Sequence, residues 1–161
     1  MYLDVNKMNR YRPRIADKIL KDKLDSKGAV LIEGAKWCGK TTSASQIAKS
    51  ILYMQDPEKV RQHIELAEIK PSKLLEGKNP RLIDEWQIAP QLWDAVRFAV
   101  DQRDEFGQFI LTGSAVPADV SKISHSGVGR ITKMLMRPMS LFESGESNGT
   151  VSLKELFEGD H

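Results

Sequence analysis

The sequence is poor in cysteine and histidine and contains no long apolar run. Its one cysteine, Cys38, excludes an internal disulfide bond and a zinc site built from several cysteines. The three histidines include no pair at helical spacing and therefore give no indication of zinc. No apolar stretch approaches the ~18 residues of a membrane span, and residues 1–14 lack the apolar region of a secretory signal. We therefore expect a cytoplasmic protein without membrane contact.

The composition is that of an ordinary globular chain. The 161 residues suffice for one domain, and 40% hydrophobic and 29% charged residues exclude a fibrous repeat or general disorder. The net charge of +2 is uneven, because residues 1–28 hold eight Lys or Arg against four Asp. Such a basic segment contacts nucleic acid or an acidic partner, or forms a solvated helix face. Its alternation with Asp17, Asp22 and Asp25 favours the solvated face.

Short apolar runs alternate with segments of helical periodicity along the chain. The apolar runs predict strands, over 29–32, 51–54, 82–85, 109–111 and 131–139. The periodic segments predict helices, over 13–28, 42–50, 56–67, 90–103 and 151–157. Two of these helices have apolar stripes that predict core positions: Ile15, Ile19, Leu20 and Leu24 in the first, and Leu92, Trp93, Val96, Phe98 and Val100 in the fourth. We also expect Met134, Met136 and Met139 to fill gaps in the core. Residues 115–130 are small, polar and rich in glycine and serine, which is typical of a mobile loop. Strands that alternate with helices in this order predict an α/β fold with a largely parallel sheet.

The strongest motif is a complete G-x-x-x-x-G-K-T pattern between a predicted strand and a predicted helix. It reads Gly34-Ala35-Lys36-Trp37-Cys38-Gly39-Lys40-Thr41, and we call residues 34–41 the glycine loop. Its glycines let the backbone curl so that amide N–H groups point at phosphate oxygens, and the following helix adds its positive end. We expect Lys40 to contact the β- and γ-phosphates, Thr41 to bind Mg²⁺ and Thr42 to belong to the same site. The whole glycine loop is thus predicted to bind a nucleotide.

Two acidic residues, Asp84 and Glu85, end the predicted strand 82–85. A carboxylate at the end of a neighbouring parallel strand can reach the Mg²⁺ shell, and the adjacent glutamate can deprotonate the attacking water. We therefore expect Asp84 to help hold Mg²⁺ and Glu85 to act as the base, which favours hydrolysis over phosphoryl transfer. Because residues 6–9 (NKMN) lack the final acid of a guanine-reading Asn-Lys-x-Asp segment, ATP is the expected nucleotide.

Six segments of the chain form a specific combination. They are YRPR at 11–14, GAKWCGKTT at 34–42, LIDEWQ at 82–87, FILTGS at 109–114, GVGR at 127–130 and RPMSLFE at 137–143. In this combination the chain resembles the bacterial and archaeal AAA-type ATPases that carry a C-terminal domain of unknown function, the AAA_14/DUF4143 family. The resemblance implies a three-layer P-loop NTPase fold of the AAA-like class. It also implies an additional strand between the strand of the glycine loop and the acidic strand.

The resemblance further implies two site residues and a division into segments. Thr112 matches a polar sensor of the γ-phosphate, and Arg130 matches an arginine finger or sensor that acts in its own subunit or a neighbour's. The implied segments are a basic helical segment, 1–28, packed on an ATPase core, 29–143, and a tail, 144–161. We expect this tail to be the start of a second, largely helical domain.

These patterns together predict Mg²⁺-dependent ATP hydrolysis, with Lys40, Glu85 and Arg130 as the catalytic residues. A nucleotide-dependent switch with little turnover, which uses ATP to order residues 115–130, is the first alternative. A nucleic-acid-associated motor or regulator that acts through residues 1–28 is the second. A small-molecule kinase is the third, although the sequence has no signature of an acceptor site. A homo-oligomer or a complex with a partner protein is compatible with each reading.

Overall fold

The computed structural model describes residues 11–113 and 129–159. Within these ranges five strands form one parallel sheet in the order β2-β3-β4-β1-β5. The strands are β1 (Ala29–Glu33), β2 (Ser50–Tyr53), β3 (Arg81–Asp84), β4 (Phe109–Thr112) and β5 (Ile131–Leu135). The predicted α/β class with a parallel sheet is confirmed. Strand β4 lies between β1 and β3, which is the place of the additional strand that the family resemblance implies.

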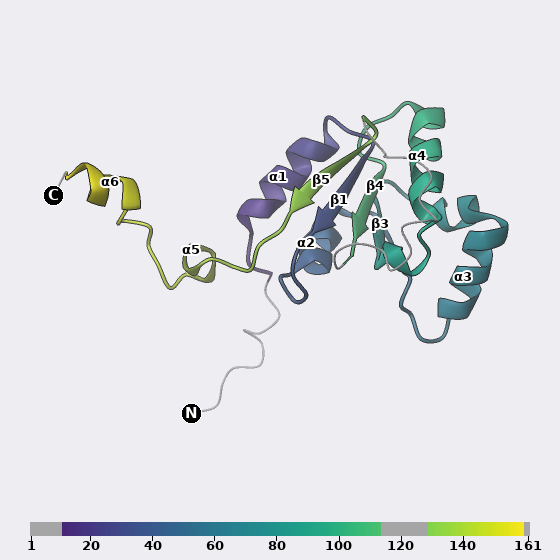
Figure 1. Cartoon of the computed structure of the whole chain (residues 1–161), viewed down its shortest axis with the longest axis horizontal. Coiled ribbons are helices and arrows are strands. Elements are labelled where there is room, and N and C mark those ends of the chain that lie inside the picture. Colours follow the sequence, from purple (N-terminus) through teal and green to yellow (C-terminus); the bar gives the residue numbers. More distant parts are fainter. Residues whose placement is uncertain (1–10, 114–128, 160–161) are drawn as a thin grey trace.

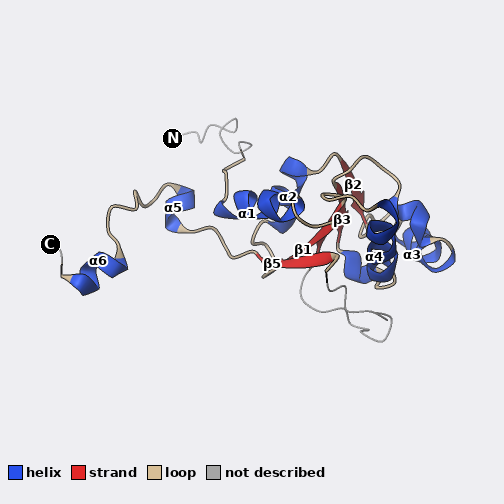
Figure 2. Cartoon of the chain, turned by 90° about the horizontal axis from the view of Figure 1, so that it is seen from above, coloured by secondary structure: helices blue, strands red, loops and turns tan. Residues whose placement is uncertain are grey.

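Helices cover both faces of this sheet. They are α1 (Ile15–Leu24), α2 (Lys40–Ile47), α3 (Val60–Ile69), α4 (Leu92–Arg103), α5 (Leu141–Ser144) and α6 (Leu153–Glu158), with 3-10 turns η2 (Pro71–Leu75) and η3 (Trp86–Ile88). Helices α1 and α2 lie on one face, and α3 and α4 lie on the other (Figures 1 and 2). Helices α5 and α6 follow β5 on a segment that leads away from the sheet (Figure 1). The sheet therefore has the three-layer arrangement of a P-loop fold.

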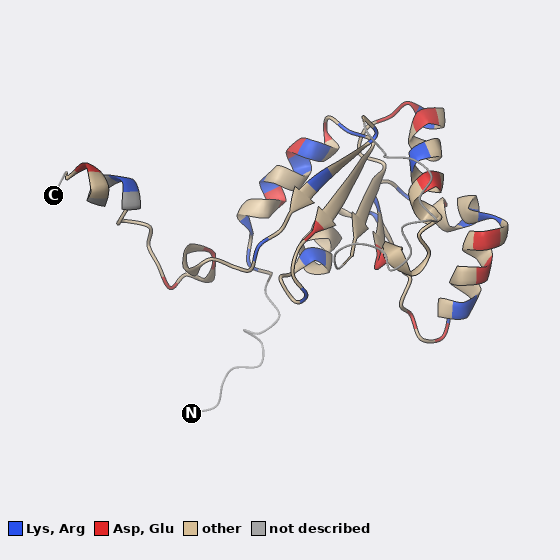
Figure 3. Cartoon of the chain, in the orientation of Figure 1, with Lys and Arg blue, Asp and Glu red and all other residues tan. Residues whose placement is uncertain are grey.

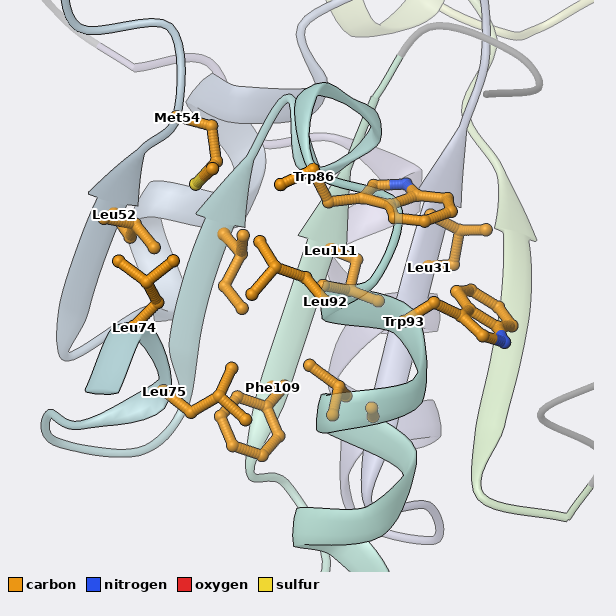
Figure 4. Close-up of a cluster of buried hydrophobic side chains, with 14 of the residues drawn as sticks. Leu31, Leu52, Met54, Leu74, Leu75, Trp86, Leu92, Trp93, Phe109 and Leu111 are labelled. Atoms are coloured by element: carbon orange, nitrogen blue, oxygen red, sulfur yellow. The ribbon is translucent and has the colours of Figure 1, made fainter. Parts of the chain in front are cut away.

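The sheet is the middle layer because its strands are apolar on both faces. All four residues of β4 and the first four of β1 are buried, as expected of parallel strands that are covered on both sides. One face packs against α3, α4 and η2 in a cluster that includes Trp86 and Trp93, whose ring centroids are 5.2 Å apart (Figure 4). The other face packs against Leu20 and Leu24 of α1 and Ala44 of α2.

Four predicted core positions are wrong. Phe98, predicted to share the apolar face of α4, is 60% exposed. It lies two positions after the buried Val96, which places it about 200° around the helix from that residue. Ile15 and Ile19, both predicted for the apolar stripe of α1, are 60% and 44% exposed. They lie roughly 100–180° around the helix from the buried Leu20 and Leu24. Met139 follows Pro138 beyond the end of β5 and is 40% exposed, so it does not fill a core gap.

Several sequence predictions fall outside what the structure tests. Most of the predicted mobile loop, residues 115–128 of 115–130, lies outside the described residues. The division into residues 1–28, 29–143 and 144–161 stays a prediction.

Helix α1 carries Lys and Asp side chains together rather than a uniformly basic face (Figure 3). In the described parts of the chain, no helix combines the length and apolar character needed to cross a bilayer.

Candidate functional site

The glycine loop connects β1 to α2 and depends on two unusual backbone conformations. Gly39 has φ +95° and directly precedes Lys40, the first residue of α2. Gly34 has φ +151°, and a Cβ at this position would overlap the Met136 carbonyl oxygen and lie 3.2 Å from the Cys38 sulfur. Side chains rarely tolerate such φ values, so glycine is required at the point where the chain leaves β1.

We expect the substitution Gly34→Ala to destabilise the fold by about 2–3 kcal/mol, because it adds a steric overlap to backbone strain. For a domain of this size, that loss corresponds to a fall in melting temperature of roughly 5–10 °C, measured by differential scanning calorimetry. Gly145→Ala is the control, because Gly145 also has a positive φ, +80°, but no atom within 4 Å of an added Cβ. Equal falls for the two variants would contradict the steric argument.

A pocket of about 700 Å³ opens beside the glycine loop at the carboxyl edge of the sheet. It is lined by residues of the loop, of α2 and of the segments that follow β2 and β3: Lys36, Trp37, Gly39, Lys40, Thr41, Thr42, Gln55, Asp84, Glu85 and Ile88. The loop residues Gly34, Ala35 and Cys38 do not line it. The carboxyl ends of parallel strands are the usual place for a ligand in an open α/β sheet.

The Lys40 side chain is held across the glycine loop. Its ammonium group donates hydrogen bonds to the carbonyl oxygens of Gly34, at 2.9 Å, and Ala35, at 2.8 Å. The residue is only 7% exposed and yet lines the pocket. A cation is thus fixed at the N-terminus of α2, where the helix dipole adds positive potential. Both features favour an anion in the pocket.

Asp84 is the centre of a hydrogen-bond cluster at the end of β3. Its Oδ1 accepts hydrogen bonds from the hydroxyl groups of Thr41 and Thr112, both at 2.6 Å, and its Oδ2 accepts one from the Gln55 amide at 2.6 Å. The neighbouring strands bring these groups together, because Asp84 and Thr112 are register partners on β3 and β4. Sequence patterns gave no signal for Gln55, which lies beyond the end of β2.

Glu85 follows Asp84 in a left-handed backbone conformation, with φ +58°. Its carboxylate accepts a hydrogen bond from the Gln87 side-chain amide, and its side chain lines the pocket. Gln87 in turn lies against Gly113, where any Cβ would overlap the Gln87 amide oxygen. Non-glycine residues with positive φ are strained and are concentrated at functional sites. Gln87 is therefore a second site residue that sequence reasoning did not single out, although it lies within the LIDEWQ segment.

Two neighbouring residues of the glycine loop differ in burial. Trp37, with φ +68°, is 91% exposed at the outer surface of the loop. Cys38 is buried, and its sulfur lies 3.4 Å from the Met136 carbonyl oxygen, away from the pocket. Any contact between Cys38 and a ligand would therefore involve its backbone. Thr112 is 1% exposed, and its hydroxyl contacts the site by its hydrogen bond to Asp84.

Arg130 lies at the opposite edge of the sheet. Its carbonyl oxygen accepts a hydrogen bond from the amide of Ala29, the first residue of β1, and its guanidinium forms an ion pair with Asp101 at 2.5 Å. The glycine loop follows the other end of β1, and five strand residues span roughly 16 Å. The structure thus does not bring Arg130 into the pocket of its own chain.

A buried ion pair lies behind the glycine loop. Arg14 Nε and Glu143 Oε1 are 3.1 Å apart, and their side chains are 6% and 8% exposed. The Glu143 carboxylate also accepts hydrogen bonds from the amides of Ser140 and Ile15, both at 2.8 Å, and from the Ser140 hydroxyl at 2.9 Å. These bonds, that of the Ser140 amide first, lower the pKa of Glu143 from 4.5 to about 2.

This low pKa predicts a pH-dependent contribution to stability. The charged carboxylate stabilises the fold above its ordinary pKa of 4.5, and this contribution is lost as the pH falls toward 2. We expect Glu143→Gln to lower the free energy of unfolding by about 2 kcal/mol at pH 7, or roughly 4–8 °C in melting temperature. Melting curves between pH 7 and pH 2 should converge for the two proteins below pH 4.5. A difference that persists unchanged at pH 2.5 would refute the assignment.

The fold and the pocket together define a class of protein. A parallel sheet in this order, with a G-x-x-x-x-G-K-T loop at its carboxyl edge, is that of a nucleotide-binding P-loop NTPase of the AAA type. The model of the family AAA_14, described as an AAA domain, matches residues 26–144, and the chain belongs to this family. A comparison with curated proteins found no match. The second domain that the resemblance implies lies outside the matched residues and stays a prediction.

Proposed function

We propose that this AAA domain binds ATP with Mg²⁺ and hydrolyses it. The observation that carries the proposal is the convergence of Lys40, Thr41, Asp84 and Glu85 on one pocket. The first two residues come from the start of α2 and the last two from the end of β3, so that a cation, a hydroxyl and two carboxylates face the same space. This is the set of groups that phosphoryl-transfer sites of the P-loop class use.

Lys40 and the glycine loop would bind the phosphates. The Lys40 ammonium already contacts two carbonyl oxygens of the loop, so small movements would transfer its hydrogen bonds to phosphate oxygens. Charge-assisted hydrogen bonds of this kind are the strong ones. The N-terminus of α2 adds further positive potential at the same point.

The Thr41 hydroxyl and the Asp84 carboxylate fit a Mg²⁺ ion. Mg²⁺ takes oxygen ligands, commonly one or two carboxylates with substrate phosphates and water. Among the described residues no group of three or more His, Cys, Asp or Glu side chains is arranged to hold a metal ion. When bound, Mg²⁺ would neutralise phosphate charge. Thr112 and Gln55 would keep the Asp84 carboxylate oriented, through their hydrogen bonds to its two oxygens.

Glu85 would deprotonate the attacking water. Its carboxylate lines the pocket next to Asp84, and the Gln87 amide restrains it from the other side. General-base catalysis by such a group contributes typically ~10²–10⁴-fold to a rate. Thr112 as a γ-phosphate sensor would act through Asp84, since the two side chains are hydrogen bonded. Arg130 would contribute only to the pocket of a neighbouring chain, as an arginine finger that requires an oligomer.

Titration calorimetry with Mg–ATP, paired with a phosphate-release assay, tests the proposal. Binding together with steady phosphate release that requires Mg²⁺ is the expected result. Tight binding without phosphate release would replace hydrolysis by the nucleotide-dependent switch. Neither heat nor a thermal shift at millimolar Mg–ATP would overturn nucleotide binding by this chain.

A further inference from the structure

Two motifs that have no part in the proposed reaction meet behind the glycine loop. YRPR, at 11–14, precedes α1, and RPMSLFE, at 137–143, leads from the end of β5 into α5. Arg14 is the last residue of the first motif, and Glu143 is the last residue of the second. Their ion pair joins positions 129 residues apart in the chain. The last residue of each motif therefore has its partner in the other motif.

Arg14 also contacts the glycine loop directly. Its Nη1 donates a hydrogen bond to the carbonyl oxygen of Cys38 at 3.0 Å, and its Nη2 donates one to the carbonyl oxygen of Arg137 at 2.9 Å. With the bond from Nε to Glu143, the guanidinium has three different acceptors and is buried. The planar guanidinium has several N–H donors in fixed directions, so it can bind three separate acceptors at once. A lysine ammonium lacks this geometry.

The Cys38 carbonyl determines where the next amide points. The Cys38–Gly39 peptide is trans and planar, so its C=O and N–H groups lie in the same plane and point in opposite directions. Because Arg14 holds the carbonyl on the side of α1 and β5, the Gly39 N–H is directed to the opposite side. Gly39 lines the pocket, which makes this amide a donor available to a phosphate oxygen.

Tyr11, at the other end of the YRPR motif, makes a second contact with the same region. Its hydroxyl donates to Asp17 at 2.6 Å and lies 3.0 Å from the Ser43 hydroxyl, in the first turns of α2. Burial, aided by the bond to Asp17, raises the pKa of Tyr11 to about 12, so the hydroxyl stays protonated at neutral pH. Asp17 also accepts a hydrogen bond from the Arg14 amide, which ties the two contacts together.

We propose that Arg14 is a positioning residue for the glycine loop, and that Glu143 holds Arg14 in place. The proposal rests on the proposed function only where it concerns nucleotide affinity. Through this pair the shape of the loop depends on α5, the helix that carries the chain away from the sheet. A partner or segment that displaces α5 would therefore weaken nucleotide binding without touching the pocket.

The first experiment measures hydrogen exchange in the nucleotide-free chain. Arg14→Gln should speed exchange of the Cys38 and Ser43 amides, which donate to the Ala35 and Gly39 carbonyls, about tenfold more than amides of β4. Strand β4 is the internal reference, because a variant that is only less stable speeds exchange there equally. Arg137→Gln is the matched control, since the Arg137 side chain is exposed and only its carbonyl is used.

The second experiment measures Mg–ATP affinity by calorimetry for the same proteins. We expect Arg14→Gln to weaken binding about tenfold, Arg14→Lys and Glu143→Gln to weaken it less, and Arg137→Gln to leave it unchanged. Equal exchange and equal affinity for Arg14→Gln and Arg137→Gln would overturn the proposal. Faster loop exchange with unchanged affinity would refute the link to nucleotide binding. If the parent chain binds no nucleotide, the proposed function fails, and the exchange experiment still decides whether Arg14 positions the loop.

Discussion

The substitution Lys40→Ala is expected to weaken Mg–ATP binding by about 10- to 100-fold, because a hydrogen bond to a charged group contributes about 1.5–3 kcal/mol. Lys40 is the one loop cation that is both buried and directed across the pocket edge, by its bonds to Gly34 and Ala35. Its removal takes positive charge from the place where phosphates would accumulate negative charge. Calorimetric titration with Mg–ATP measures the effect directly.

Lys36→Ala provides the matched control for this prediction. Lys36 belongs to the same loop and lines the same pocket, but its side chain is exposed to solvent. An exposed charge is screened, so we expect its loss to change the affinity only about threefold. Lys40→Met, which keeps most of the side-chain volume, separates lost charge from lost packing. Similar affinities for the Lys36 and Lys40 variants would contradict the role assigned to Lys40.

The substitution Glu85→Gln is expected to leave Mg–ATP affinity within about threefold of the parent and to lower turnover by ~10²–10⁴-fold, the usual contribution of a general base. Glutamine has the same shape as glutamate and can still contact Gln87, but it cannot accept the proton of the attacking water. Phosphate release under saturating Mg–ATP measures turnover, and calorimetry measures affinity in the same preparation.

Glu33→Gln serves as the control for the base. Glu33 is a carboxylate at the same edge of the sheet, at the end of β1, where it pairs with Lys133 at 3.0 Å. Because Glu33 does not line the pocket, we expect turnover to stay near the parent rate. Hydrolysis by Glu85→Gln at the parent rate would show that another group deprotonates the water.

The strands of the sheet were predictable because a strand that is buried on both faces has a continuous run of apolar residues in the sequence. β1 and β4 consist of apolar residues up to their last positions, Glu33 and Thr112, and a glycine follows each strand. The order of the strands has no local sequence pattern, and the family resemblance implied only one part of it, the additional strand between β1 and β3. The predicted strand 82–85 ends one residue early, because Glu85 adopts a left-handed conformation that no alternation of apolar residues indicates.

The candidate site was predictable only where its residues share a motif or a strand end. Lys40 and Thr41 follow from the G-x-x-x-x-G-K-T spacing, and Asp84 follows from its place after a short apolar strand. The contacts of Gln55 with Asp84 and of Arg14 with Cys38 were not predictable. These partners lie 29 and 24 residues apart in the chain and come into contact only in the folded structure. The distance of Arg130 from the pocket likewise depends on strand direction and order, not on a local pattern.

The position of the three tryptophans has an optical consequence. Trp86 and Trp93 are each 5% exposed in the apolar core, whereas Trp37 is 91% exposed on the glycine loop. Indole emission shifts to longer wavelength in water, so the red edge of the fluorescence spectrum belongs to Trp37. Iodide, which quenches only solvent-accessible indoles, would remove that edge alone. The chain thus carries its own spectroscopic reporter beside the pocket, and ligand titrations can be followed without an attached dye.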